Sequence, residues 1–179
     1  MKHNDLLKLI KEIVDNDTHV SGLEKRTNNY LKLLNDFTYV KSFNNFNIMM
    51  KNDNNEDITF IALDENNEKV IAILKIFYDD YSTNSYKISE TWTDQKYRNK
   101  GIMKNLIIAF VEKFNKILSD EKQTTEAKKI CGKSLLTNNS GLNPIIYDKL
   151  ENKVLPYTKD RDDIIWNNNN PDLLVGLMK

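Results

Sequence analysis

The chain has 179 residues, 40% of them hydrophobic and 29% charged, and its 26 basic residues balance 26 acidic ones. This balance argues against a general nucleic-acid-binding surface, and no apolar run approaches the roughly 18 residues that a membrane-spanning helix needs. One cysteine and two histidines exclude an internal disulfide and supply too few ligands for a zinc site. We therefore expect a single cytoplasmic domain over residues 1–179, with no metal, nucleic acid or membrane as partner.

The first half of the chain passes from helical to extended patterns. Two segments near the N-terminus carry apolar residues at helical spacing, and the next segment mixes β-forming residues with asparagines, which favours a strand. Two β-branched runs then flank the polar sequence DENNE, which is typical of a hairpin. The expected elements are helices at residues 4–16 and 23–37 and strands at residues 38–50, 58–63, 70–78 and 85–93.

The second half contains the strongest amphipathic pattern, with apolar residues three and four positions apart from Met103 to Leu118. Further along, Pro144 suits the first turn of another helix. We attribute the frequent asparagines to compositional bias and give them no mechanistic weight. The expected elements are helices at residues 101–118 and 145–150 and strands at residues 130–136, 154–158 and 173–178. Residues 1–55 would then hold the N-terminal helices and a first strand, and residues 56–179 the core.

The sequence TWTDQKYRNKGIMKNLI, at residues 91–107, places a basic turn with a glycine between a strand and the amphipathic helix. A helix N-terminus has unpaired N–H groups and a partial positive charge. Gly101 has no Cβ, so the chain can come close to a phosphate group, and Arg98 and Lys100 add positive charge. An ordinary strand-to-helix turn with solvated bases, in which Asp94 caps the turn, has the same spacing. Neither a dinucleotide fingerprint nor a Walker loop is present here.

Part of this segment, DQKYRNKGIMKNLI, resembles the acyl-CoA-binding motif of the GNAT superfamily of N-acetyltransferases, Q/R-x-x-G-x-G/A. Met103 stands where the family usually has a small residue. A second stretch, NNSGLNPIIYDKLE at residues 138–151, resembles the family's later signature, although Glu151 and Asn152 replace the usual Gly-Phe. The residues that match the first motif in register are Arg98, Asn99, Lys100, Gly101, Ile102 and Met103, and the resemblance assigns them to cofactor binding.

The resemblance implies an α/β (α+β) fold, in which a central mixed, mostly antiparallel sheet is flanked by helices. Its motif strand is splayed and is followed by the CoA-binding helix. The implied reaction transfers an acetyl group from acetyl-CoA to an amine of a small molecule or protein, by direct attack in a ternary complex. Backbone N–H groups of the motif strand near Thr93 would hold the thioester oxygen, and Asn139 would bond the CoA arm or hold its own loop.

Two residues are candidates for proton transfer. The resemblance places Tyr147 as the acid that protonates the CoA sulfur, and the alternative is a half-buried aromatic residue on a short helix. Glu90, on the motif strand, is the candidate base, and the alternative is an exposed strand residue.

Other functions fit the same residues. A GNAT-fold protein without catalysis, serving as a binding or assembly component, would explain Met103 and the missing Gly-Phe. An acyltransferase that modifies one macromolecular target is a special case of the enzyme. A homodimer or a protein partner is compatible with each of these functions.

Overall fold

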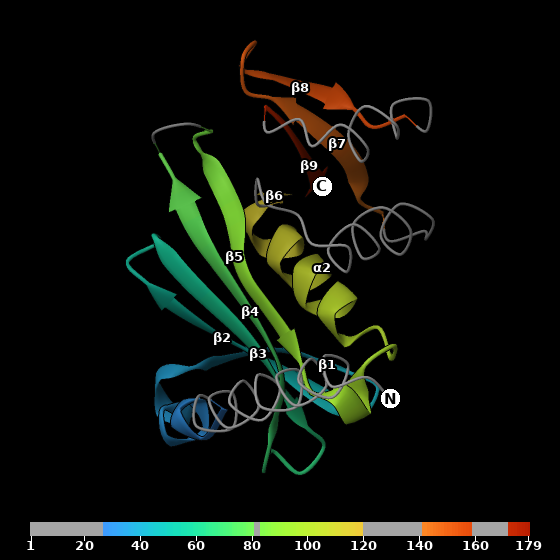
Figure 1. Ribbon diagram of the computed structural model, residues 1–179. Coiled ribbons are helices and arrows are strands. Elements are labelled where there is room, and N and C mark those ends of the chain that lie inside the picture. The colour runs from blue at the N-terminus through green and yellow to red at the C-terminus, as the bar shows by residue number, and fades with distance from the viewer. Residues whose placement is uncertain (1–26, 81–82, 120–140, 159–171) are drawn as a thin grey trace, which may run out of the picture.

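The computed structural model describes residues 27–80, 83–119, 141–158 and 172–179, and their nine strands form one sheet (Figure 1). The expected elements at residues 4–16 and 130–136, and Asn139, lie outside the described residues. The order across the sheet is β1-β2-β3-β4-β5-β6-β9-β7-β8. The strands are β1 (Thr38–Phe43), β2 (Phe46–Asp53), β3 (Asp57–Asp64), β4 (Val70–Asp79), β5 (Ser85–Thr93), β6 (Lys116–Leu118), β7 (Asn143–Asp148), β8 (Lys153–Pro156) and β9 (Leu173–Met178).

The sheet is mixed and mostly antiparallel, as expected. Strands β1 to β5 follow one another as antiparallel neighbours, and β9 lies antiparallel between β6 and β7. Among the described strands, the parallel pair is β5 with β6. The strands predicted at residues 58–63, 70–78, 85–93 and 173–178 are confirmed as β3, β4, β5 and β9.

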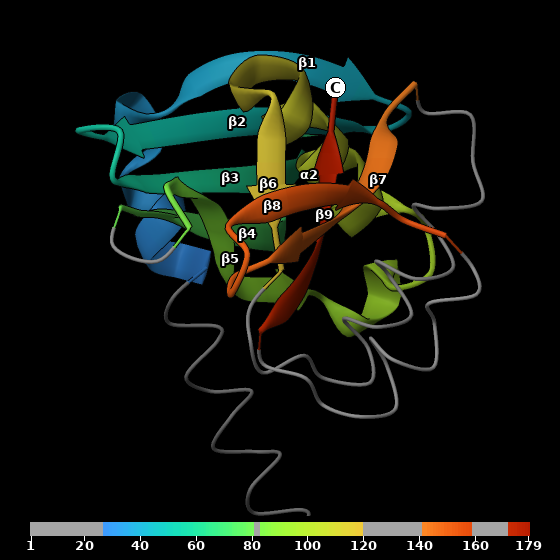
Figure 2. The same cartoon turned by 90° about the horizontal axis from the view of Figure 1, so that it is seen from above.

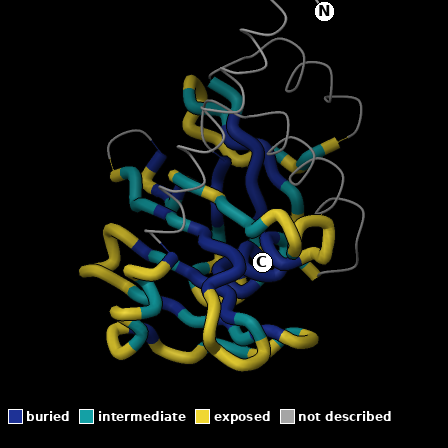
Figure 3. Tube along the Cα trace, turned by 60° about the horizontal axis from the view of Figure 1, so that its bottom comes forward, coloured by how far each residue is buried: buried dark blue, intermediate teal, exposed yellow. Residues whose placement is uncertain are grey.

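Helix α2 (Ile102–Phe114) covers one face of the sheet and contacts β1, β3, β4, β5 and β6 (Figures 1 and 2). The fully buried Leu106 and Phe110 belong to a core cluster with apolar residues of β2, β3 and β4. The rings of Phe60 and Phe110 meet edge to face, with centroids 5.9 Å apart. Figure 3 shows the buried residues concentrated along these packed elements and the exposed ones at the turns.

The opposite face of β2 to β5 carries a smaller apolar cluster. Residues 27–32 are helical, and the 3-10 helix η1 (Leu34–Asp36) follows them. Tyr30 and Trp92 pack there against a cluster of buried residues, namely Phe37, Ile61, Leu63, Val70 and Ile73. The sheet is therefore covered on both faces near β3 and β4.

A β-bulge in β5 changes the face of the sheet to which its side chains point partway along the strand. Ile88 pairs with Ile76 and Glu90 pairs with Lys75, so Ser89 is an extra residue without a partner on β4. Because side chains alternate along a strand, one extra residue moves all later side chains to the other face. Ile88 packs in the α2 cluster, whereas Trp92 packs in the cluster on the opposite face.

Strands β5 and β6 part soon after they meet. Their register contains one pair, Lys87 with Leu118, after which β5 continues to Thr93 while the chain beyond β6 follows β9. The Ser119 amide donates to the Val175 carbonyl at 2.7 Å. Beyond Lys87, the described residues thus leave the β6-facing edge of β5 without a paired strand, which agrees with the expected splay.

Two predicted helices are wrong in part or in full. The helix expected at residues 101–118 ends at Phe114, because Asn115 takes a positive φ of 68° and turns the chain into β6. The helix expected at residues 145–150 is strand β7. Its residues pair with β8 on one side and β9 on the other, and this tertiary pairing overrides a weak local preference.

The remaining predicted elements need smaller changes. The strand expected at residues 38–50 is a hairpin of β1 and β2 that turns at Asn44, and the strand expected at residues 154–158 is β8. Of the predicted helix at residues 23–37, residues 27–32 are helical, and η1 follows.

The asparagines do have a structural role. Among the described residues, those other than glycine with positive φ are Asn44, Asn54, Asn55, Asn67, Asn84, Asn99, Asn115 and Asn152. Asparagine tolerates the left-handed region better than other residues with a side chain. These asparagines therefore mark turns, a conformational signal that the interpretation by composition did not use.

Candidate functional site

The turn before α2 is built by the end of β5 and by the 3-10 helix η2 (Gln95–Tyr97). Asp94 caps η2 by accepting a hydrogen bond from the Lys96 amide at 2.9 Å, so the expected capping role is confirmed. Gly101 is the N-cap of α2 with φ 74° and ψ 10°. Among the described residues, a Cβ added at Gly101 would meet only the Asn105 Nδ2, at 3.8 Å. The left-handed backbone therefore favours glycine at this position, and no described side chain fills the space above it.

The first turn of α2 presents backbone amides. The Asn105 amide donates to the Gly101 carbonyl at 3.1 Å, and the Asn105 side chain donates to the same oxygen at 2.8 Å. The amides of Ile102 and Met103 precede this bond and have no partner inside the helix. The Met103 side chain is buried in the core and does not cover the turn. Residues 98–101 are exposed, so the turn that precedes these amides is accessible to solvent.

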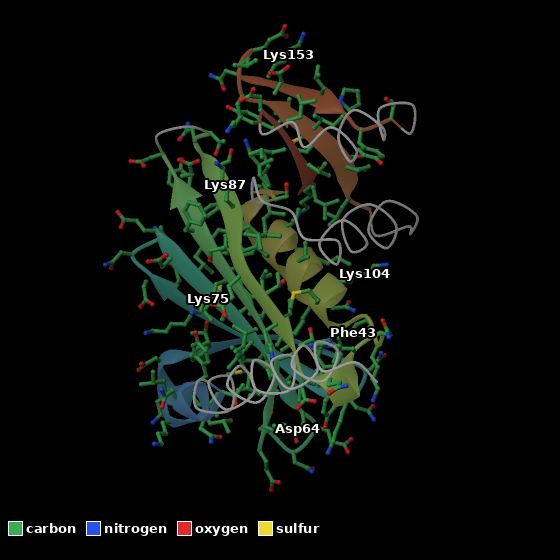
Figure 4. All side chains as sticks on the ribbon, in the orientation of Figure 1. Phe43, Asp64, Lys75, Lys87, Lys104 and Lys153 are labelled. Carbon is green, nitrogen blue, oxygen red and sulfur yellow. The ribbon has the colours of Figure 1, made fainter. Side chains whose placement is uncertain are left out.

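Basic side chains surround the same turn. Arg98 Nε donates to the Thr93 carbonyl at 3.2 Å, which ties the turn to the end of β5. Lys100 Nζ lies 4.9 Å from the centre of the Tyr97 ring, and Lys69 Nζ lies 6.0 Å from it. Lys104 projects from the first turns of α2 (Figure 4). The turn thus combines amides without a partner inside the helix, a helix N-terminus and several cations.

Asp94 balances part of this charge. It forms an ion pair with Lys69, from the β3–β4 turn. Burial raises the pKa of Asp94, but the hydrogen bonds from Lys69 and from the Lys96 amide outweigh burial and hold this pKa below its ordinary value. The carboxylate therefore stays ionised and fixes Lys69 beside the turn. Sequence reasoning missed Lys69 because it lies 25 positions before Asp94.

Glu90 lies on the sheet face opposite α2. Its Oε2 is 3.3 Å from Lys75 Nζ, and both side chains are about a third exposed. Lys75 Nζ lies 5.8 Å from the centre of the Tyr30 ring. Sequence reasoning did not find Lys75 or Tyr30, because only the strand register and the bulge place them beside Glu90.

Tyr147 lies on β7 rather than on a helix. Its side chain is buried, and its hydroxyl donates to Asn152 Oδ1 at 2.5 Å, in the turn that leads to β8. It packs with Leu118, which is the residue of β6 that pairs with β5. Lys116 Nζ lies 5.8 Å from the Tyr147 ring, and burial lowers the pKa of Lys116. Tyr147 is thus close to the point where β5 and β6 part, with its proton directed at Asn152.

A small cavity lies at that same point. It has a volume of about 10 Å³ and is lined by Ser119 and by apolar residues of β5, α2, β6 and β9. This is the size of one water molecule. Gly176 forms part of its wall, and a Cβ there would lie 2.4 Å from the Ile117 carbonyl oxygen, so β6 and β9 approach closely only with glycine at this position.

The structure therefore brings some predicted site residues together and separates others. Thr93 and residues 98–103 form one continuous turn, whereas Glu90 faces the other side of the sheet and Tyr147 lies on a different strand. Asn139 lies outside the described residues. No described group of three or more His, Cys, Asp or Glu side chains is arranged to hold a metal ion. None of the described helices is long and apolar enough to span a membrane.

Comparison with known proteins gave one family match. The model of the acetyltransferase (GNAT) family matches residues 27–121, which is more than half of the 179-residue chain. No curated protein matches the sequence. One solved structure with similarity is a protein assigned as a streptothricin acetyltransferase from Bacillus anthracis str. Ames, in complex with acetyl coenzyme A. It is 15% identical, with 80% of this chain and 88% of that chain covered and a TM-score of 0.35.

Proposed function

This chain belongs to the acetyltransferase (GNAT) family, and we propose that it transfers an acetyl group from acetyl-CoA to an amine by direct attack in a ternary complex. The observation that carries the proposal is the exposed turn before α2, which follows a strand whose edge beyond Lys87 has no paired strand among the described residues. Family membership gives the reaction class, and the turn gives a place where the co-substrate fits.

The residues of the turn suit a pyrophosphate group. Backbone amides of Gly101, Ile102 and Met103 would donate to its oxygens, and a helix N-terminus favours negative charge. Arg98 and Lys100 would supply positive charge, and the positive φ of Asn99 shapes the approach to Gly101. The open space above Gly101 supports this assignment, because no described side chain fills it.

The transfer itself needs three kinds of group. The acceptor amine must lose a proton to attack, and Glu90 is the proposed base. The attack forms a C–N bond, and the thioester oxygen takes negative charge, which N–H groups on the open edge of β5 near Thr93 would stabilise. The C–S bond then breaks, and Tyr147 would return a proton to the sulfur. Asn139 would bond the CoA arm.

A second function has specific support. Glu90 is already paired with Lys75, and the Tyr147 hydroxyl is already bonded to Asn152. A base and an acid engaged in this way are also what a GNAT-fold protein without catalysis would contain. Such a protein would bind a ligand or a partner and would not turn over acetyl-CoA.

Calorimetric titration with acetyl-CoA tests the proposed turn. Gly101→Arg should abolish binding, because the side chain would occupy the space above the amides and strain the left-handed backbone by about 1–2 kcal/mol. Asn54→Arg is the matched control, since Asn54 also has a positive φ, of 60°, and is exposed in the β2–β3 turn, outside the proposed site. We expect it to bind acetyl-CoA as the native chain does.

The outcomes separate the two functions. Binding that Gly101→Arg abolishes, followed by acetyl transfer to an amine in a product assay, supports the enzyme. Binding without any transfer supports the non-catalytic protein. Equal affinity of the native chain and Gly101→Arg would show that the turn is not the binding site.

A further inference from the structure

The sheet face opposite α2 carries a cation held between a carboxylate and an aromatic ring. Lys75 on β4 and Glu90 on β5 are directly opposite each other in the register, with Nζ and Oε2 3.3 Å apart. The Tyr30 ring lies over the same ammonium group, at 5.8 Å. Trp92, two positions after Glu90, packs in the same cluster as Tyr30. A carboxylate with two nearby aromatic rings is an arrangement that binds alkylammonium groups.

The bulge at Ser89 creates this arrangement. Without the extra residue, Glu90 and Trp92 would follow Ile88 onto the face that α2 covers. With it, both lie on the face of Tyr30, in a strand that also leads directly into the exposed turn before α2. Because of the bulge, the second half of β5 faces the helical residues 27–32, while its C-terminal end leads into the proposed cofactor turn.

The Lys75 ammonium group is accessible to solvent and stays charged. The exposed fractions of the Lys75 and Glu90 side chains are 34% and 33%, so a molecule from solvent can reach them. Burial lowers the pKa of Lys75, but the hydrogen bond and charge interactions with Tyr30 and Glu90 outweigh burial and raise it. The surroundings thus favour a protonated primary amine, which is the group that an acceptor substrate presents before it loses its proton.

We propose that Glu90, Tyr30 and Trp92 form the binding site for the alkylammonium group of the acceptor, and that Lys75 fills this site when no acceptor is bound. The acceptor class is then a cationic primary amine, such as a polyamine or a lysine side chain. Its arrival would displace the Lys75 ammonium from Glu90. The identification of the bound amine as an acceptor rests on the proposed acetyl transfer. The binding site itself is tested without acetyl-CoA.

Substitutions at the two ends of the ion pair should have opposite effects. Lys75→Met removes the internal competitor, and we expect the affinity for a simple alkylammonium probe to rise about two- to fivefold, the range expected for one partly exposed ion pair. Glu90→Gln removes the carboxylate, and we expect the affinity to fall by a similar or larger factor. If the pair had only a structural role, neither change would alter binding of the probe.

The experiment is a titration with n-butylammonium chloride, followed by nuclear magnetic resonance of the Trp92 indole N–H, with n-butanol as the neutral control. Trp166→Phe identifies the Trp92 signal. Lys41→Met is the matched control, because Lys41 forms a similarly exposed ion pair with Glu112 between β1 and α2, at 2.6 Å. Lys75→Gln is a second variant in case Lys75→Met does not fold. Saturable shifts with the ammonium and not with the alcohol are expected in the native chain, with the opposite changes described above.

Three results would overturn the inference: no saturable shift in the native chain and the Lys75 variants, equal shifts with n-butanol, or a Lys41→Met effect equal to that of Lys75→Met. The result is independent of the acetyl-CoA titration. Ammonium binding with the predicted signs but no acetyl-CoA binding would leave the site standing and remove the proposed function. Acetyl-CoA binding without ammonium binding would leave the proposed function standing and remove the ammonium site.

Discussion

The two halves of β5, before and after Ser89, differ in almost every respect that governs stability and chemistry. Before the bulge, Ser85 and Lys87 are buried and the strand meets both β4 and β6. After the bulge, no residue of β5 is buried, and in the described residues the strand pairs with β4 alone. The first half is part of the core, and the second half is where ligands can approach.

The ion pairs of the two halves of β5 also differ in how far they are buried. Lys87 and Asp79 are 2.6 Å apart with side chains only 6% and 12% exposed, at one end of the β4–β5 pair. Lys75 and Glu90 are 3.3 Å apart and about a third exposed, beyond the bulge. Removing one partner of a buried pair leaves a desolvated charge and is costly, whereas the exposed pair can exchange a partner at little cost. The same chemistry thus holds the strand at one end and is available for recognition at the other.

The largest expected effect, that of Tyr147→Phe, would show that the chemistry is not confined to the open half of β5. Tyr147 is the proposed catalytic residue that packs on the paired side, against Leu118. If it is the acid, Tyr147→Phe lowers the rate of acetyl transfer by roughly 10²–10⁴-fold. Asn152→Gly is the control, because it removes the same hydrogen bond, keeps the phenol and accepts the positive φ of 49° at this position. Steady-state rates with saturating acetyl-CoA measure both variants.

If Tyr147→Phe and Asn152→Gly reduce the rate equally, the hydrogen bond supports the β7–β8 hairpin and Tyr147 is not the acid. If neither variant changes the rate, all of the chemistry belongs to the open half of β5. That outcome would sharpen the division between the two halves and direct attention to Glu90 and the exposed turn.

Deletion of Ser89 should have the next largest effect. Without the bulge, Glu90 would point at the α2 core and Trp92 would leave its apolar cluster, which we expect to cost about 2–4 kcal/mol in the free energy of unfolding. Ser89→Ala keeps the extra residue, and because Ser89 is exposed we expect a change below about 0.5 kcal/mol. Urea unfolding followed by tryptophan fluorescence measures both. Equal stability of the deletion and the native chain would mean that the strand re-forms the bulge at a neighbouring residue.

Much of the fold could be predicted from local patterns. The β-branched runs predicted β3 and β4, and the glycine after a basic turn marked the start of α2 correctly. The end of α2 could not be predicted from periodicity, because Ile117 and Leu118 continue the apolar spacing although they are buried in β6. The asparagine at position 115 was the available signal, since asparagine takes left-handed conformations readily.

The candidate site could be predicted only in its contiguous part. Residues 98–103 are adjacent in sequence, so a motif describes them. Glu90 was predicted as a base, but its pairing with Lys75 and the face of the sheet on which it lies depend on the bulge. Regular alternation along β5 would have placed it on the face that α2 covers. Tyr147 lies in a short apolar segment that suits either a helix or a strand, and pairing with β8 and β9 decides it.

The smallest expected effect concerns the junction between the open half of β5 and α2. Asp94 accepts the Lys96 amide and pairs with Lys69, and its pKa is held below the ordinary value of 3.8. A carboxyl whose pKa is lower in the folded state stabilises the fold at pH values above its unfolded pKa, and this stabilisation is lost as the pH falls through the folded value. Asp94→Asn keeps an acceptor for the Lys96 amide but removes the charge, so it should cost about 0.2–1 kcal/mol at pH 7, and the difference should narrow below about pH 4.

Lys69→Met separates the two contributions to this effect. It keeps the cap on η2 but removes the cation, so part of the stability should remain and the acid transition should move to higher pH, because the pKa of Asp94 loses the partner that lowers it. Urea unfolding between pH 3 and pH 7 measures all three proteins. Equal stability of Asp94→Asn and the native chain across this pH range would mean that the charge of Asp94 is unimportant and that only its capping hydrogen bond, which asparagine can also accept, holds the turn.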